Sequence, residues 1–227
     1  KHYKAKILLT SSCVVYGIRH SEISTFSEDY WGYVNFLSPR ACYDEGRRFA
    51  ETAFITYKNV YQIPIKIARI FRTYGPRMPL FDGQMIADFV LQALTNQPLV
   101  IYGDQNFATS LCYISDIVEG LIRMMNSSET GPINLGSPRE YKLADVAQQI
   151  IKMCNSQSII THQPSLKFIS ALGLPNIGLA KKKLDWYPVI SLEEGLKNTI
   201  DYIQRHRLQL EPLANQQYQQ DGKSEKS

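Results

Sequence analysis

The sequence lacks several features that would assign a chain to a class of protein at once. No window approaches 18 uninterrupted apolar residues, so we expect no membrane-spanning segment and no membrane contact. No signal peptide is recognised. The cysteines form no Cys-x-x-Cys pair and no Cys/His cluster, which argues against a metal site. We therefore expect the four of them to be reduced, buried thiols of a cytoplasmic protein: Cys13, Cys42, Cys112 and Cys154.

The charge balance excludes a strongly acidic or basic protein. Lys and Arg number 25 against 21 Asp and Glu, a formal charge of +4 that is scattered along the chain and predicts no nucleic-acid partner. The excess suits a small anionic ligand, and solubility alone explains it equally well. Hydrophobic residues make up 44% of the 227 residues, as in a folded domain. Residues 211–227 are polar and Gln-rich and are predicted to form a disordered tail.

The apolar pattern alternates between segments typical of strands and segments typical of helices. Strands are expected at 5–10, 65–71, 99–102 and 133–136, with a short extended piece at 113–114 and a turn at 73–77. Helices are expected at 41–61, 86–94, 116–125 (with Ser115 as N-cap), 143–154, 178–184 and 191–206. This alternation predicts an α/β fold with a parallel sheet, in which ligands bind beyond the carboxyl ends of the strands. No G-x-G-x-x-G loop occurs, so no phosphate-binding helix start is assigned.

Ser12, Tyr43 and Arg47 are the leading candidates for chemistry. Tyr43 and Arg47 are four residues apart, which places both on one helix face. A cation there would lower the pKa of the phenol from its usual value of about 10 and make it a usable general base. Ser12, at the end of the first expected strand, would hydrogen-bond the same substrate oxygen. Taken alone the pattern is weak, because a solvated tyrosine beside a surface arginine is more common on a helix.

Longer segments around these residues resemble a known superfamily. They are Ser-Ser-Cys-Val-Val-Tyr-Gly at 11–17, Tyr-Trp-Gly-Tyr-Val-Asn at 30–35, Arg-Ala-Cys-Tyr-Asp-Glu-Gly-Arg-Arg-Phe-Ala-Glu at 40–51 and Ala-Arg-Ile-Phe-Arg-Thr-Tyr-Gly-Pro-Arg-Met at 68–78. Together they resemble the extended short-chain dehydrogenase/reductases, the NAD-dependent epimerase/dehydratase superfamily. Segments 30–35 and 42–51 are most similar to its UDP-glucuronate decarboxylase (UDP-xylose synthase) branch. The resemblance covers nearly all of residues 5–205.

The resemblance implies the C-terminal part of a Rossmann-like, doubly wound parallel sheet plus a small mixed α/β substrate-binding lobe. Residues 1–76 with 111–136 would form the partial NAD-binding domain, and 77–110 with 137–210 the nucleotide-sugar-binding lobe. The glycine-rich turn of this fold would precede residue 1, so we expect the chain to be part of a longer protein. Relatives dimerise through a helix pair that includes the tyrosine helix. Either the apolar side chains of this helix supply such a homodimer face, or they pack against the sheet: Cys42, Phe49, Ala53 and Tyr57.

The activity implied by the resemblance is NAD-dependent decarboxylation of UDP-glucuronate to UDP-xylose. Oxidation at C4 of the sugar places a ketone beta to the carboxylate, so that CO₂ can leave before the ketone is reduced again. The implied catalytic residues are Tyr43 as base, Ser12 as its partner at the C4 oxygen, and Arg47 where the family has the lysine that holds the nicotinamide ribose. The implied cofactor contacts are Ser11, Ser12, Tyr43, Arg47 and Thr73. The implied substrate contacts are Arg72, Arg77, Tyr102 and Thr109.

Several residues depart from the decarboxylase pattern. Position 14 is Val where the decarboxylases usually have Glu, which is more like a 4-epimerase. Arg47 replaces Lys, Arg72 replaces Asn, and Thr109 stands where Arg is usual. Three functions therefore stay open for the full protein: the decarboxylase, another nucleotide-sugar reaction such as 4-epimerisation or 4,6-dehydration, and a non-catalytic relative acting as a binding or regulatory subunit.

Overall fold

The computed structural model describes residues 5–19, 22–80, 85–104, 106–165 and 172–206, so the expected tail at 211–227 lies outside the described residues. The chain divides into two compact units. Unit 1 comprises Lys1–Thr73, Phe107–Tyr141 and Ser165–Val189, and unit 2 comprises Tyr74–Asn106, Lys142–Pro164 and Ile190–Ser227. The described residues 172–189 therefore belong to unit 1, whereas they were expected in the second lobe. The nucleotide and sugar-binding roles of the two parts remain predictions.

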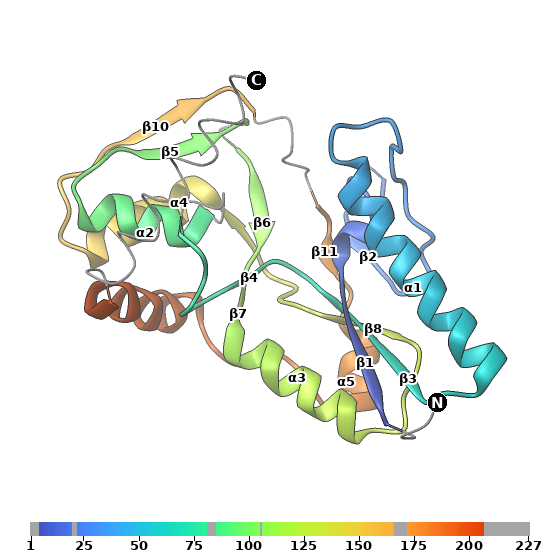
Figure 1. Cartoon of the computed structure of the whole chain (residues 1–227). Coiled ribbons are helices and arrows are strands. Elements are labelled where there is room, and N and C mark those ends of the chain that lie inside the picture. The colour runs from blue at the N-terminus through green and yellow to red at the C-terminus, as the bar shows by residue number, and fades with distance from the viewer. Residues whose placement is uncertain (1–4, 20–21, 81–84, 105, 166–171, 207–227) are drawn as a thin grey trace. The chain divides into compact units, whose positions relative to one another are not determined.

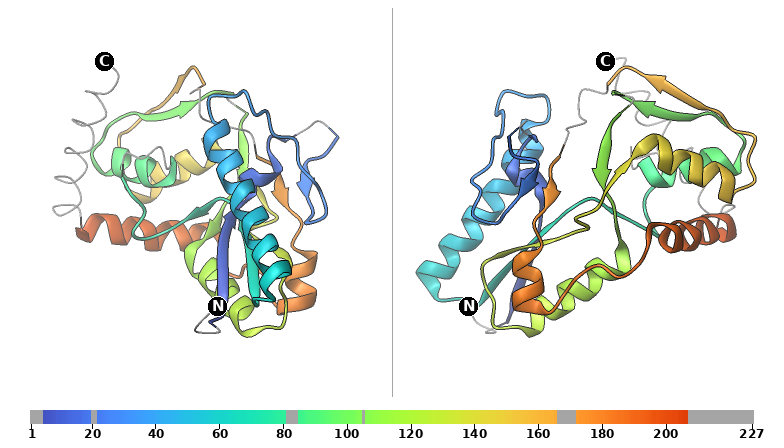
Figure 2. Two further views of the ribbon diagram at one scale, coloured as in Figure 1. Left: turned by 45° about the vertical axis from the view of Figure 1, so that its right-hand side comes forward. Right: turned by 180° about the vertical axis from the view of Figure 1, so that it is seen from behind.

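A three-stranded parallel sheet forms the centre of unit 1. Its strands are β1 (Ile7–Ser12), β3 (Ile65–Ile70) and β8 (Pro132–Leu135), in the order β1-β3-β8. Helix α1 (Ala41–Tyr61) contacts both β1 and β3 and lies along β1 (Figure 1 and Figure 2). Helix α3 (Ile114–Asn126) contacts β3, and α5 (Gly178–Leu184) contacts β8.

Side chains alternate across this sheet. Leu8, Ala68 and Ile70 face a core that α3 and α5 complete with Ile117, Leu184 and other residues, including the buried Trp186. The odd-numbered neighbours Ser11 and Arg69 face α1 instead, since both contact Glu51 of that helix. Burial on both faces explains why residues 65–70 are mostly apolar rather than strictly alternating.

A second core lies beyond the end of β1. Strand β1 passes directly into a 3-10 helix, η1 (Cys13–Tyr16), whose four residues are all buried. The ring of Tyr16 lies 5.0 Å from that of Phe26 in β2 (Thr25–Phe26), and β2 pairs in parallel with β11 (Leu174–Pro175). Unit 1 also contains the short strands β6 (Ala108–Ser110) and β7 (Cys112–Tyr113), while β4 (Thr73–Tyr74) and β9 (Glu140–Lys142) each include residues of both units.

Unit 2 packs helices against a two-stranded parallel sheet. Strands β5 (Leu99–Tyr102) and β10 (Ile160–Gln163) pair, and both contact α4 (Leu143–Met153). Helix α2 (Met85–Leu94) contacts α4 and β5, and its Phe89 and Val90 are buried. A further helix covers residues 192–206.

The expected α/β fold with parallel strands is confirmed, and so are the principal helices and strands. The expected N-cap Ser115 is wrong, because α3 follows β7 directly. The N-cap of α3 is Tyr113, in extended conformation, and Ser115 lies in the first turn of the helix. Part of the expected 73–77 turn is the strand β4. All four cysteines are free thiols, but only Cys13 and Cys112 are buried as expected. Cys42, in the first turn of α1, is exposed, and Cys154, at the C-terminal end of α4, is half-buried. None of the helices described here is long and apolar enough to cross a membrane.

Candidate active site

Tyr43 lies in the first turn of α1 with 45% of its surface exposed. Two cationic side chains lie close to its ring. The Cζ atom of Arg40 is 5.0 Å from the ring centroid, and that of Arg47 is 5.2 Å from it. Both distances are within the range of a cation–π contact. Arg40 is itself held by the Asp44 carboxylate, which accepts a hydrogen bond from its Nε at 2.9 Å. Tyr43 is therefore partly exposed, with two guanidinium groups near its ring.

Arg47 links this end of α1 to β1. Its Nη1 donates to the backbone carbonyl of Thr10 at 3.4 Å, two residues before Ser12. The expected juxtaposition of Tyr43 and Arg47 on one helix face is confirmed, and that face meets the carboxyl end of a parallel strand. Ligands of open α/β sheets bind beyond this edge.

The two neighbouring serines of β1 have different surroundings. The Ser12 hydroxyl caps η1 by accepting a hydrogen bond from the Val14 amide at 3.4 Å. The Ser11 side chain faces α1, where its hydroxyl donates to Oε1 of Glu51 at 2.5 Å, and the residue is buried. The cofactor contact expected of Ser11 remains a prediction, because this hydroxyl already has a protein partner.

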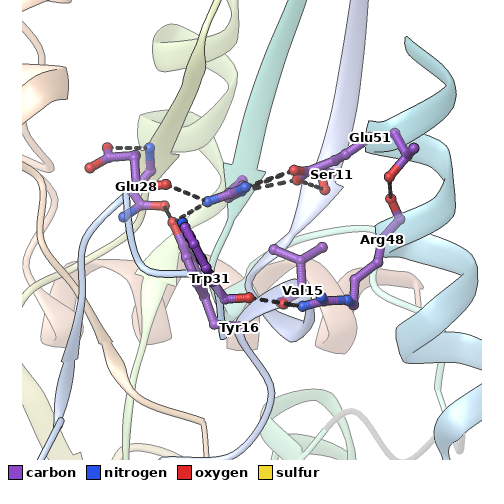
Figure 3. Close-up of polar contacts among 10 residues, drawn as sticks. Ser11, Val15, Tyr16, Glu28, Trp31, Arg48 and Glu51 are labelled. Carbon is purple, nitrogen blue, oxygen red and sulfur yellow. Dashed lines mark hydrogen bonds and ion pairs between the residues drawn. The ribbon is translucent and has the colours of Figure 1, made fainter. Parts of the chain in front are cut away.

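Glu51 is part of a buried polar network (Figure 3). The sequence pattern had indicated no functional role for Glu51 or for its partner Arg69. Arg69 of β3 donates to both carboxylate oxygens of Glu51, from Nη2 at 2.8 Å and from Nε at 3.0 Å, and to the Tyr16 hydroxyl at 2.8 Å. Tyr16 in turn donates to the side-chain oxygen of Asn134 at 2.7 Å. Burial raises the pKa of Tyr16 to about 12, so this phenol stays protonated.

Arg48 holds the segment that follows Ser12. Its Nη1 donates to the Val15 carbonyl at 2.9 Å and to the Trp31 carbonyl at 3.0 Å (Figure 3). Gly17, with φ of +75°, ends η1 so close to the backbone of Tyr33 that a Cβ would lie 1.9 Å from its carbonyl oxygen. Only glycine fits this approach.

The remaining predicted ligand residues lie in different places. In unit 1, the Thr73 hydroxyl donates to the Phe71 carbonyl at 2.9 Å, and Thr109 is buried with its hydroxyl 3.4 Å from the Ser110 carbonyl. Burial lowers the pKa of Arg72, which interacts electrostatically with Cys13 of η1 and with Arg40. Arg77 and Tyr102 belong to unit 2. Among the residues that the structure describes, no three His, Cys, Asp or Glu side chains come close enough together to hold a metal ion.

Unit 1 thus combines a parallel sheet ending in Ser12 with a tyrosine and a basic residue one helical turn apart, as expected from the superfamily that the sequence resembles. The chain belongs to the NAD dependent epimerase/dehydratase family, whose model matches residues 1–136. It is 42% identical over 218 residues to UDP-glucuronic acid decarboxylase 1 of Danio rerio, covering 96% of this chain and 51% of that protein. It is 40% identical over 202 residues to UDP-glucuronic acid decarboxylase 1 of Arabidopsis thaliana, covering 88% and 46%. The chain therefore spans about half the length of the curated relatives it matches.

Solved structures show the same fold. Epimerase Mth375 from Methanothermobacter thermautotrophicus matches 91% of this chain and 61% of its own with a TM-score of 0.82 and 27% identity. UDP-glucuronic acid 4-epimerase from Bacillus cereus, in complex with UDP-glucuronic acid and NAD, matches 88% and 62% with a TM-score of 0.78 and 25% identity. The expected superfamily and its Rossmann-type fold are thereby confirmed.

Proposed function

We propose that the full protein is an NAD-dependent UDP-glucuronate decarboxylase that produces UDP-xylose. The observation that carries this proposal is the 42% identity, over nearly the whole chain, to a relative named for that activity. The geometry supports it, because Tyr43 is exposed at the sheet edge where such a substrate would bind.

The residues of this edge fit the nicotinamide end of the cofactor. An exposed phenol, two guanidinium groups beside it and the strand-end Ser12 offer donors and positive charge to ribose hydroxyls and to an anionic ligand. Tyr43, Arg47, Ser12 and Thr73 would hold that end of NAD. When bound, NAD takes a hydride from the sugar and returns it.

The side chains would then share the proton chemistry. Tyr43 removes the proton of the C4 hydroxyl, and Ser12 hydrogen-bonds the same oxygen. The carboxylate beta to the resulting ketone would leave as CO₂, its bonding electrons passing into an enolate that takes a proton from water at C5. When the ketone is reduced again, Tyr43 would return its proton to the C4 oxygen.

The test incubates the full-length protein with UDP-glucuronate and NAD and measures CO₂ release and UDP-pentose formation. We expect both products, and we expect Tyr43→Phe to abolish them while Tyr61→Phe, which changes an equally exposed tyrosine of α1, retains them. Intact NAD binding without turnover by the wild-type protein would refute the decarboxylase and favour a non-catalytic, partner-binding relative.

A second candidate is 4-epimerisation of a UDP-sugar. The observation that favours it is Val14, which is 3% exposed within η1 and supplies no carboxylate beside Ser12. The fold similarity to UDP-glucuronic acid 4-epimerase is compatible with it. Product analysis separates the two candidates, since an epimerase yields UDP-galacturonate from UDP-glucuronate and releases no CO₂.

We also propose that the protein is a homodimer formed through α1. Phe49, Tyr57 and Val60 are 73%, 55% and 63% exposed, so they do not pack against the sheet of unit 1. Light scattering with size-exclusion chromatography tests this proposal: Phe49→Glu is expected to convert a dimer into a monomer, and an unchanged mass would contradict the interface.

A further inference from the structure

Tyr43, Arg47 and Glu51 form one row along α1. They are spaced by four residues, so their side chains project from the same helix face. Arg47 and Glu51 contact consecutive residues of β1. Arg47 donates a hydrogen bond to the Thr10 carbonyl, and Glu51 accepts one from the Ser11 hydroxyl. The row that begins with the candidate base therefore meets the strand just before Ser12.

The Glu51 carboxylate collects hydrogen bonds from two strands. Ser11 of β1 donates to it at 2.5 Å, and Arg69 of β3, which pairs with Ser11 in the sheet register, donates through Nη2 and Nε at 2.8 and 3.0 Å. Glu51 is 6% exposed, so water competes little for these bonds. Because such charge-assisted bonds are strong and directional, a displacement of α1 along the sheet would break several of them together.

Arg69 also holds the segment after Ser12. Its Nη1 donates to the Tyr16 hydroxyl at 2.8 Å, and its Cζ lies 4.7 Å from the centroid of the Tyr16 ring. Tyr16 ends η1, which begins directly after Ser12. Glu51 and Arg69 thus connect the helix of Tyr43 with the chain on both sides of Ser12.

We propose that Ser11, Glu51 and Arg69 form a positioning unit that holds Ser12 in register with Tyr43. The proposal deepens the proposed function, on which its kinetic test rests. Ser11 then acts through Glu51 rather than as a cofactor contact. Proton transfer tolerates only small changes in donor–acceptor distance, so loosening this unit lowers kcat more than it weakens substrate binding.

The test compares Glu51→Gln with Glu119→Gln in the full-length protein. Glu119 also pairs with an arginine, but its ion pair with Arg123 is exposed on α3 of the same unit. For Glu51→Gln we expect kcat to fall about ten-fold or more while KM for UDP-glucuronate changes by less than about three-fold. Hydrogen–deuterium exchange at residues 10–14 should become faster. Glu119→Gln should match the wild type in all three measurements.

Ser11→Ala keeps the test decisive if Glu51→Gln does not fold, because it removes one hydrogen bond and leaves the ion pair intact. We expect its kcat to fall about three- to ten-fold at unchanged KM, again with faster exchange at residues 10–14. A kcat within about two-fold of the wild type, or unchanged exchange at these residues, overturns the proposal. If the wild-type protein does not turn over UDP-glucuronate, the proposed function fails, and the exchange measurement alone decides the positioning role.

Discussion

Replacing Arg69 by methionine should destabilise unit 1 severely, because the change leaves a buried carboxylate with little compensation. The side chains of Arg69 and Glu51 are only 13% and 8% exposed. Arg69→Met removes the three hydrogen bonds that Arg69 donates to Glu51 and leaves this carboxylate the Ser11 hydroxyl. Loss of one partner of a buried ion pair costs about 3–5 kcal/mol. The substitution also removes the hydrogen bonds that Arg69 donates to the Tyr16 hydroxyl and to the Glu28 carbonyl, and each loss adds roughly 1 kcal/mol to the destabilisation.

Urea denaturation of the full-length protein, followed by tryptophan fluorescence, measures this loss. Trp186 is buried in the core of unit 1 and reports its unfolding, and Trp31→Phe removes the signal of the exposed tryptophan of this chain. Lys183→Met, which breaks a partly exposed ion pair with Glu129, is the control and should cost less than about 1 kcal/mol. The double variant Arg69→Met with Glu51→Leu should recover part of the stability, since no unpaired charge stays buried. A single-variant cost below about 1 kcal/mol, or a double variant no better than the single, would refute the reasoning.

Three further predictions follow from contacts already described. Tyr43→Phe should lower turnover of the full-length protein by about 10²- to 10⁴-fold, with an unchanged melting temperature because the ring and its cation–π contacts remain; steady-state kinetics and calorimetry check this. Gly17→Ala should destabilise unit 1 by about 2 kcal/mol or more, whereas Gly46→Ala, with open space in the middle of α1, should stabilise it by about 0.5–1 kcal/mol; equal unfolding free energies in urea would contradict this. Burial raises the pKa of Cys13 from 9.0 to about 11, so the folded protein keeps the thiol proton at pH values where the unfolded chain has lost it. This difference contributes to the free energy of unfolding. The contribution is complete below pH 9 and is lost as the pH rises towards 11. Between pH 8 and 10.5 the free energy of unfolding should therefore fall less for Cys13→Ala than for the wild type. Parallel plots of this free energy against pH would argue against the burial of the thiol.

The sequence predicted what depends on local pattern. Apolar spacing predicted α1 at its observed bounds, and the four-residue spacing placed Tyr43 and Arg47 on one face. Two- and three-residue strands such as β2 and β6 were missed, because so few residues show no period.

The surroundings of the candidate base were harder to predict. Arg40 precedes the helix, so helical spacing gave no reason to place it over the ring of Tyr43. Glu51 continues the row of Tyr43 and Arg47, and this was the available signal for a contact with β1. Its partnership with Arg69 depends on the pairing of Ser11 with Arg69 in the sheet, which the sequence of one chain does not determine.

The opposite orientations of Ser11 and Ser12 limit how this strand can change during evolution. Deleting or inserting a single residue within Ile7–Ser12 would exchange the sides to which the two hydroxyls point, offering the wrong one to Glu51. Substitutions can therefore accumulate along β1, but changes in its length cannot. When distant homologues are aligned, gaps should be placed outside this strand.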